Sequence, residues 1–130
     1  MARKVQAGAI AFRYRGKRTE FLLVSRPNFP GEWVFPKGNV KTDDSLEETV
    51  LKELREEAGA DGVVLSRIGR LERGTVKRPV SITYFLVHSG RTVPNGEGRK
   101  VRWLSLNEAE ELLQDRGARA LLRRAADEIG

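Results

Sequence analysis

The stretch SLEETVLKELREEAGA, residues 45–60, carries the strongest helix signal in this chain of 130 residues. Ser45 and Glu48 have the spacing of a capping box, in which each side chain accepts a hydrogen bond from the other residue's backbone. Gly59 is suited to end the helix, because glycine readily adopts the left-handed conformation of a C-terminal cap. Apolar residues recur at helical spacing between these ends, at Val50, Leu51, Leu54 and Ala58. The pattern predicts an amphipathic helix that packs through this stripe.

Three acidic residues, Glu53, Glu56 and Glu57, share a face of this helix beside the apolar stripe. Like charges four residues apart, as at Glu53 and Glu57, destabilise a helix unless something compensates them. One interpretation is ordinary: the glutamates are solvated and pair with Lys52 and Arg55. The other is a divalent cation, since Mg²⁺ prefers oxygen ligands and a further carboxylate nearby can act as a base.

The rest of the chain alternates strand-like apolar segments with polar loops and ends in helical patterns. Two further helices are predicted, at 108–114 with Asn107 as N-cap and at about 117–128. The predicted strands cover residues 4–13, 20–26, 33–35, 63–72, 80–87 and 100–106. The predicted loops include residues 37–44, 73–78 and 91–98. This order of strands and helices predicts an α+β or α/β sandwich in one domain, residues 1–130.

Composition narrows the classes of function. The chain has no cysteine, which excludes disulfides and thiolate metal sites and fits a reducing, cytoplasmic location. No apolar run approaches the length of a membrane helix, so no membrane association is expected. Lys and Arg number 24 against 18 Asp and Glu, giving a net charge of +6. This excess suits a polyanionic partner such as a nucleotide, polyphosphate or RNA, although plain solubility would also account for it.

The acidic helix belongs to a longer pattern. Residues 38–60 read G-x5-D-x7-K-E-L-x-E-E-x-G-A, which resembles the Nudix box, G-x5-E-x7-R-E-U-x-E-E-x-G-U with U aliphatic. The segments WVFPKG (33–38) and GRKVRWLSLNEAEELL (98–113) resemble Nudix enzymes that act on dinucleoside or diphosphoinositol polyphosphates. Two positions depart from the box: Asp44 replaces Glu, and Lys52 replaces an Arg that braces carboxylates. Lysine cannot make the planar two-pronged contact of arginine.

This resemblance implies a mixed β-sheet flanked by helices and a hydrolase that requires Mg²⁺ or Mn²⁺ and breaks a P–O–P bond. Glu56 and Glu57 are expected as core metal ligands, and Glu53 as a ligand or as the group that deprotonates water. The Lys37 carbonyl matches a backbone ligand, and Gly38 would let the loop pass close to the metal. Glu97 is expected to be a further catalytic or metal-binding glutamate, with a solvated turn acid as the alternative.

Substrate binding requires cations and a surface for the base. Lys37, beside the predicted metal loop, is the first candidate, followed by Arg26, Arg73, Lys77 and Arg78. Tyr84 and Phe85 are adjacent in a strand, so they should face opposite sides, and Tyr84, like Trp33, would either stack on a base or pack in the core.

The expected substrate is a dinucleoside polyphosphate such as diadenosine tetra- or hexaphosphate. A diphosphoinositol polyphosphate, a triphosphorylated RNA end and an oxidised nucleotide remain alternatives within the same class. A catalytically weak module that binds RNA or a nucleotide is the alternative from another class. The protein is expected to be a monomer or a homodimer.

Overall fold

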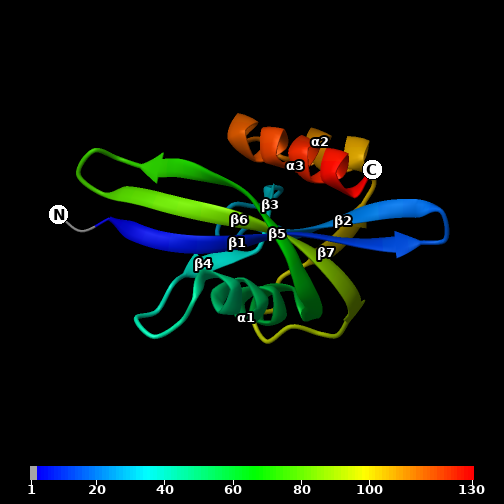
Figure 1. The fold of residues 1–130 in the computed structure, drawn as a ribbon, viewed down its shortest axis with the longest axis horizontal. Helices are drawn as coiled ribbons and strands as arrows, with labels where there is room; N and C mark the ends of the chain where they lie inside the picture. Colours follow the sequence, from blue (N-terminus) through cyan, green and yellow to red (C-terminus); the bar gives the residue numbers. More distant parts are fainter. Residues whose placement is uncertain (1–2) are drawn as a thin grey trace.

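The computed structural model describes residues 3–130 as a seven-stranded sheet with helices on both faces (Figure 1). The strands are β1 (Lys4–Arg15), β2 (Arg18–Ser25), β3 (Trp33–Val34), β4 (Lys37–Asn39), β5 (Ala60–Gly74), β6 (Pro79–Thr92) and β7 (Val101–Leu104). The helices are α1 (Leu46–Ala58), α2 (Leu106–Leu112) and α3 (Arg116–Ile129). Helix α1 covers one face, whereas α2 and α3 cover the other.

The sheet is mixed, as the resemblance implied. Its main order is β3-β2-β1-β6-β5, with β4 paired to β1 and β7 paired to β2. Strands β1 and β6 run parallel, and every other pairing is antiparallel. The prediction of a sandwich built on a mixed β-sheet flanked by helices is therefore confirmed. Among residues 3–130, no helix is long and apolar enough to cross a bilayer.

Two hydrophobic cores fill the spaces between the sheet and its helices. Side chains alternate across β6, so Tyr84 packs in the core beneath α2 and α3, whereas Phe85 packs beneath α1. This confirms that the two aromatic residues face opposite sides. Leu54 and Val50 of α1 are fully buried, which confirms that the helix packs through its apolar stripe.

Helix α1 has the ends that its sequence predicts. The Ser45 side chain accepts a hydrogen bond from the Glu48 backbone N–H, and the Glu48 carboxylate accepts one from the Ser45 N–H. Gly59 has φ 65° and donates its N–H to Arg55 O. These contacts fix the position of α1 along the sheet and therefore the position of its acidic face.

Several local predictions were wrong. β6 extends through Thr92, where a loop was expected, and α2 begins at Leu106, where a strand was expected. Residues 37–39 were expected in a loop, but they form β4 because their backbone pairs with β1, a contact that no local pattern encodes. The N-cap of α2 is Ser105 instead of Asn107. Ser105 and Glu108 form a second reciprocal capping box, which satisfies two backbone N–H groups at once.

Candidate active site

The C-terminal half of α1 presents its glutamates to β4. The carboxyl groups of Glu53 and Glu57, one turn apart, share a hydrogen bond. Glu57 is buried with 3% of its surface exposed, and Glu53 is half-buried, whereas Glu56 is exposed. The three predicted glutamates therefore lie on one helix, but two of them form a contacting pair at the edge of the packed body.

Gly38 makes the close approach of β4 to this pair possible. A Cβ atom at position 38 would lie 2.1 Å from Cδ of Glu53, far inside van der Waals contact. Glycine is favoured here by that proximity and not by its backbone conformation, because Gly38 is not in the left-handed region. The structure therefore places Gly38 beside Glu53.

Burial and mutual proximity raise the pKa values of both glutamates of this pair. Burial raises the pKa of Glu57 to about 8, and the hydrogen bond with Glu53 adds to this increase. The Arg99 guanidinium and the backbone N–H of Lys37 act in the opposite direction. Burial also raises the pKa of Glu53. The two neighbouring carboxyl groups therefore resist ionisation. A cation added beside them would favour their ionised, carboxylate forms.

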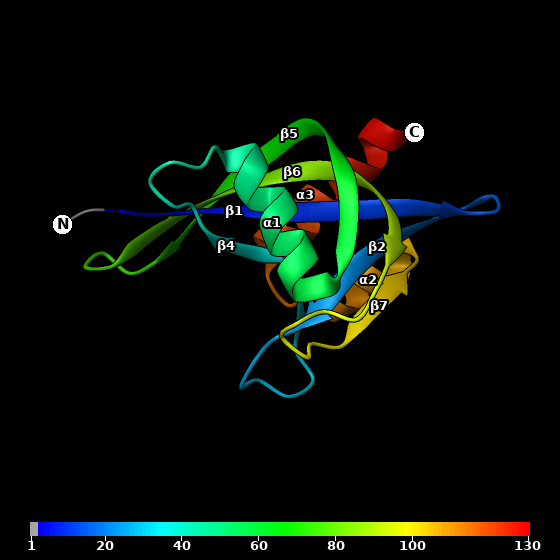
Figure 2. The ribbon, with the colours of Figure 1, turned by 90° about the horizontal axis from the view of Figure 1, so that it is seen from below.

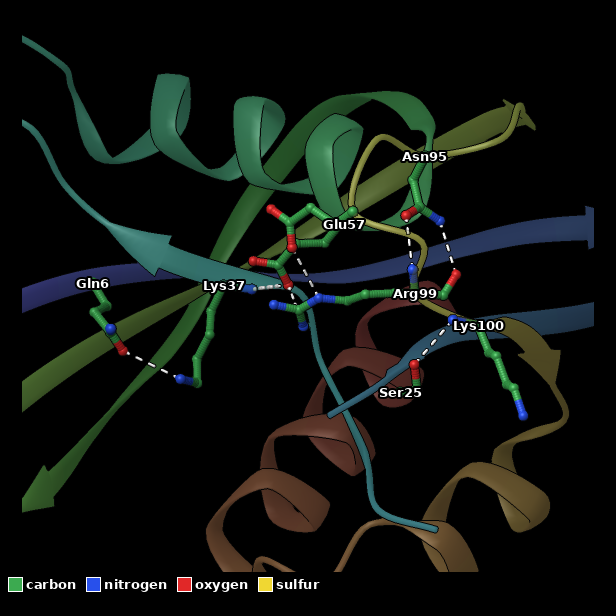
Figure 3. Close-up of polar contacts among 8 residues, drawn as sticks. Gln6, Ser25, Lys37, Glu57, Asn95, Arg99 and Lys100 are labelled. Atoms are coloured by element: carbon green, nitrogen blue, oxygen red, sulfur yellow. Dashed lines mark hydrogen bonds and ion pairs between the residues drawn. The ribbon is translucent and has the colours of Figure 1, made fainter. Parts of the chain in front are cut away.

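An arginine in the loop before β7 reaches this pair (Figure 3). Arg99 Nη1 lies 3.0 Å from Glu57 Oε1, and Arg99 Nε lies 3.0 Å from Glu97 Oε1. Its guanidinium therefore bridges two of the carboxylates that the sequence predicted as metal ligands. The sequence reasoning missed Arg99; its position two residues after Glu97 was the available signal.

Lys37 connects the glutamates to the opposite face of the sheet. Its backbone N–H points to Glu57 Oε1, with an N–O distance of 3.4 Å, while its Nζ donates to Gln6 Oε1 at 3.3 Å (Figure 3). Burial lowers the pKa of Lys37, and although Glu57 opposes this shift, Arg26, Arg99 and Lys4 reinforce it. Positive charge therefore gathers around Lys37.

A cavity of about 400 Å³ opens between the sheet and α3. Its apolar wall includes Phe35, Leu71, Val80, Ile82, Tyr84 and Leu113. Its polar lining includes Lys4, Gln6, Arg26, Lys37, Arg73 and Asp115, and Trp33 lies beside them. Lys37 therefore lines this cavity and also contacts the glutamate cluster, which consists of Glu53, Glu57 and Glu97.

Two of the cavity's arginines are already paired with acids. Arg26 Nη1 lies 2.6 Å from Glu32 Oε2 and also stacks over Phe29. Arg73 makes a two-pronged contact with Asp115, at 2.8 Å and 2.6 Å. In residues 3–130, by contrast, Lys4 and Lys37 form no ion pair, which leaves these two as the cations available to a ligand.

The remaining predicted residues are more dispersed. Lys77 and Arg78 lie in or beside the turn between β5 and β6 and do not line the cavity. Sequence reasoning also missed Lys4 and Gln6, which alternation along β1 places on the same face as each other.

The two departures from the box contact each other. Lys52 Nζ lies 3.9 Å from Asp44 Oδ2, at the limit of an ion pair and on the outer side of α1. Lys52 therefore pairs with Asp44, the other residue that differs from the box. The guanidinium that contacts Glu57 belongs to Arg99.

The donor set suits a divalent cation. Within residues 3–130, no three acidic or histidine side chains converge closely enough to form a ready-made metal site. However, Glu53 and Glu57 are in contact, Gly38 leaves no side chain between β4 and Glu53, and a positively charged guanidinium lies between Glu57 and Glu97. Hard carboxylate oxygens around a position that already holds a cation match the preferences of Mg²⁺ or Mn²⁺.

Comparison with known proteins places this arrangement among related chains. Nudix hydrolase 4 of Arabidopsis thaliana is 30% identical over 127 residues; the match covers 83% of this chain and 58% of the relative. The asymmetrical bis(5'-nucleosyl)-tetraphosphatase of Sus scrofa is 33% identical over 130 residues, covering 89% of this chain and 88% of the relative. This chain thus spans less than two thirds of the plant relative, but most of the pig relative.

Similarity to solved structures supports the fold. The crystal structure of C. elegans Ap4A hydrolase superposes with a TM-score of 0.81 at 21% identity, covering 99% of this chain and all of that one. The NUDIX domain family model matches residues 3–129. The chain therefore belongs to the NUDIX domain family.

Proposed function

We propose that this protein is a divalent-metal-dependent hydrolase that cleaves a P–O–P bond in a dinucleoside polyphosphate. The observation that carries this proposal is the contacting glutamate pair Glu53–Glu57, joined through Lys37 to a cation-lined cavity. The pig relative is named as a dinucleoside tetraphosphatase, and the C. elegans structure as an Ap4A hydrolase, which supports this substrate class.

The residues that would hold Mg²⁺ or Mn²⁺ come from the end of α1, the start of β4 and the loop between β6 and β7. They are Glu53, Glu56, Glu57, Glu97 and the backbone of Lys37 and Gly38. When bound, the ion would polarise a phosphoryl oxygen and lower the pKa of water. Glu53, half-buried and with a raised pKa, is suited to accept a proton from that water.

The cavity and its cations would bind the rest of the substrate. Lys37 and Lys4 would neutralise the phosphate chain, because both are positively charged and neither is paired with an acid. Gln6, which holds the Lys37 ammonium, would fix its position. Tyr84 is buried in the wall, and Trp33 is partly exposed at the edge, so Trp33 is better placed to stack on a base. A volume of about 400 Å³ is within the range of small-ligand sites.

A substrate panel tests the proposal. The protein is incubated with Mg²⁺ or Mn²⁺ and with diadenosine tetraphosphate, diadenosine hexaphosphate, a diphosphoinositol polyphosphate, 5′-triphosphorylated RNA and an oxidised nucleoside triphosphate. Separation of products by ion-exchange chromatography should show the highest kcat/KM for a dinucleoside polyphosphate. Faster turnover of another panel member would support the hydrolase activity but contradict the proposed substrate class.

A second candidate function is a catalytically weak fold that binds RNA or a nucleotide. It is favoured by the position of Lys52, which faces Asp44 and does not brace the glutamate pair, and by the net charge of +6. This alternative predicts no turnover of any panel member, together with tight, salt-sensitive binding of single-stranded RNA.

A further inference from the structure

The loop that joins β6 to β7 holds the Arg99 guanidinium against the glutamate cluster. Asn95 fastens the backbone of Arg99 on both sides, accepting from its N–H at 3.0 Å and donating to its carbonyl at 2.9 Å. The next residue, Lys100, makes two hydrogen bonds with Ser25: its N–H donates to Ser25 Oγ, and its carbonyl accepts from the Ser25 N–H. Farther back, the Val93 N–H donates to Gly59 O at the end of α1. Figure 2 shows this loop passing the C-terminal end of α1.

Arg99 is held between two acids, Glu57 and Glu97, whose exposed fractions differ. Glu57 is nearly inaccessible, with 4% of its side chain exposed, whereas Glu97 has 42% exposed. The Arg99 side chain itself is 17% exposed, so it borders solvent while it contacts a nearly inaccessible acid. Its guanidinium is thus the positive charge paired with the buried Glu57.

We propose that Arg99 is an internal counter-ion of the glutamate cluster and must leave Glu57 before a divalent cation can be held by Glu57 and Glu97 together. This inference rests on the proposed function. Arg99 donates to one oxygen of each carboxylate, so these oxygens and the space between them are already taken by a positive charge. A guanidinium and a divalent cation at the same oxygens would repel each other. Arg99 therefore makes the site stable without metal and lowers its affinity for metal.

The test measures metal affinity apart from activity. Wild-type protein, Arg99→Gln, Arg99→Lys and the control Arg123→Gln are freed of metal and titrated with Mg²⁺ by calorimetry. The pH is kept above the pKa of Glu57, which burial raises to about 8, so that proton binding does not dominate the comparison. Arg123 lies on α3, pairs with Glu110 and has 60% of its side chain exposed, so its replacement removes the same charge from a remote surface.

The expected result is tighter Mg²⁺ binding by Arg99→Gln, roughly tenfold relative to wild type, within the range of coupled binding events. Arg99→Lys, which keeps the charge but loses the two-pronged contact, should lie between the two. Arg123→Gln should match wild type. The metal-free Tm of Arg99→Gln should fall while its Tm at saturating Mg²⁺ is retained.

A direct readout of displacement comes from the Nε–H resonance of Arg99 in ¹⁵N NMR spectra. It should shift when Mg²⁺ is added to wild-type protein, whereas the Arg123 resonance should not. Equal or weaker Mg²⁺ binding by Arg99→Gln would overturn the inference and would make Arg99 a brace for Glu57. Failure of wild-type protein to bind Mg²⁺ would instead contradict the proposed metal-dependent function, and the inference with it.

Discussion

At the scale of single residues, the contact between Gly38 and Glu53 decides the geometry of the site. The strand β4 passes so close to α1 that the Glu53 carboxyl group fills the space where a side chain at position 38 would begin. The atoms that would collide belong to the end of a flexible side chain. A change at Gly38 should therefore displace Glu53 and leave the fold intact.

Gly38→Ala is expected to separate stability from activity. The free energy of unfolding should change by less than about 1 kcal/mol, because Glu53 can move away. The kcat should fall by about 100-fold, because a shift of the order of 1 Å in a catalytic group has that effect. Urea denaturation and steady-state kinetics measure the two quantities. Gly16→Ala, at a turn distant from the site, is a control for activity only, since its φ of 62° strains any side chain.

Glu57 should make the stability of the metal-free protein depend on pH. Its pKa rises from 4.5 to about 8 on folding, so between these values the folded chain binds more protons than the unfolded chain. Stability contributed by the protonated carboxyl group is therefore present at low pH and lost as the pH rises toward 8. Glu57→Gln should remove this contribution, so that the difference in Tm between variant and wild type grows in favour of the variant across that interval.

Thermal unfolding in EDTA, at a series of pH values, measures this difference. Glu56→Gln is the matched control, because Glu56 is exposed on the same helix. A difference between Glu57→Gln and wild type that stays constant from pH 4.5 to 8 would contradict the shift assigned to Glu57.

The structure brings together part of the site that was predicted from the sequence. Helix periodicity put Glu53 and Glu57 on one face of α1, and the resemblance to the Nudix box implied that Gly38 would lie near them. Arg99 and Lys4 could not be found in this way, since each reaches the site from a strand or loop that is distant in the chain. Lys77 and Arg78 were proposed from their charge, and the hairpin that carries them leads away from the cavity lining.

At the scale of elements, helix ends were the most predictable features. Capping depends on a few neighbouring residues, which is why α1 was located accurately from Ser45 and Gly59. The same reasoning would have found the cap of α2 at Ser105, three residues before Glu108, had the two capping boxes been compared. The short strand β4 was missed because its only signal is its pairing with β1, a tertiary contact.

Asp115 combines two roles at the start of α3, and two substitutions separate them. It caps the helix by accepting from the N–H groups of Gly117 and Ala118, and it binds Arg73 at the cavity. Asp115→Asn keeps a capping oxygen but loses the ion pair, so it should cost less than about 1 kcal/mol. Asp115→Ala loses both and should cost about 1–2 kcal/mol.

Urea denaturation at neutral pH measures both values. Equal losses in the two variants would mean that the ion pair with Arg73, and not the cap, supplies the stability.

At the scale of the whole molecule, part of the excess positive charge lies around one residue, Lys37. Cations concentrate around Lys37, where burial and the neighbouring charges of Arg26, Arg99 and Lys4 lower its pKa. The sequence predicted a polyanionic partner with Lys37 as its first candidate contact. The fold adds Lys4 and Gln6, because β1 and β4 place them with Lys37 along one path toward the glutamates.

Lys4→Gln is expected to weaken binding of a polyphosphate without changing the chemical step. The KM for diadenosine tetraphosphate should rise by about 3- to 10-fold, with kcat nearly unchanged and with a weaker dependence of KM on salt. Lys17→Gln, at the turn that follows the opposite end of β1, should leave all three quantities unaltered. An unchanged KM in Lys4→Gln would remove Lys4 from the proposed phosphate path.

The proposed function depends on a divalent ion held by the glutamates of α1 and used to break a phosphoric anhydride. The most direct measurement follows diadenosine tetraphosphate by ³¹P NMR with wild-type protein and Glu57→Gln, in Mg²⁺ and then in excess EDTA. We predict cleavage by wild-type protein in Mg²⁺, arrest by EDTA, recovery when Mg²⁺ is restored, and a rate at least about 100-fold lower in Glu57→Gln. Cleavage that continues in EDTA, or that proceeds at the wild-type rate in Glu57→Gln, would contradict the account.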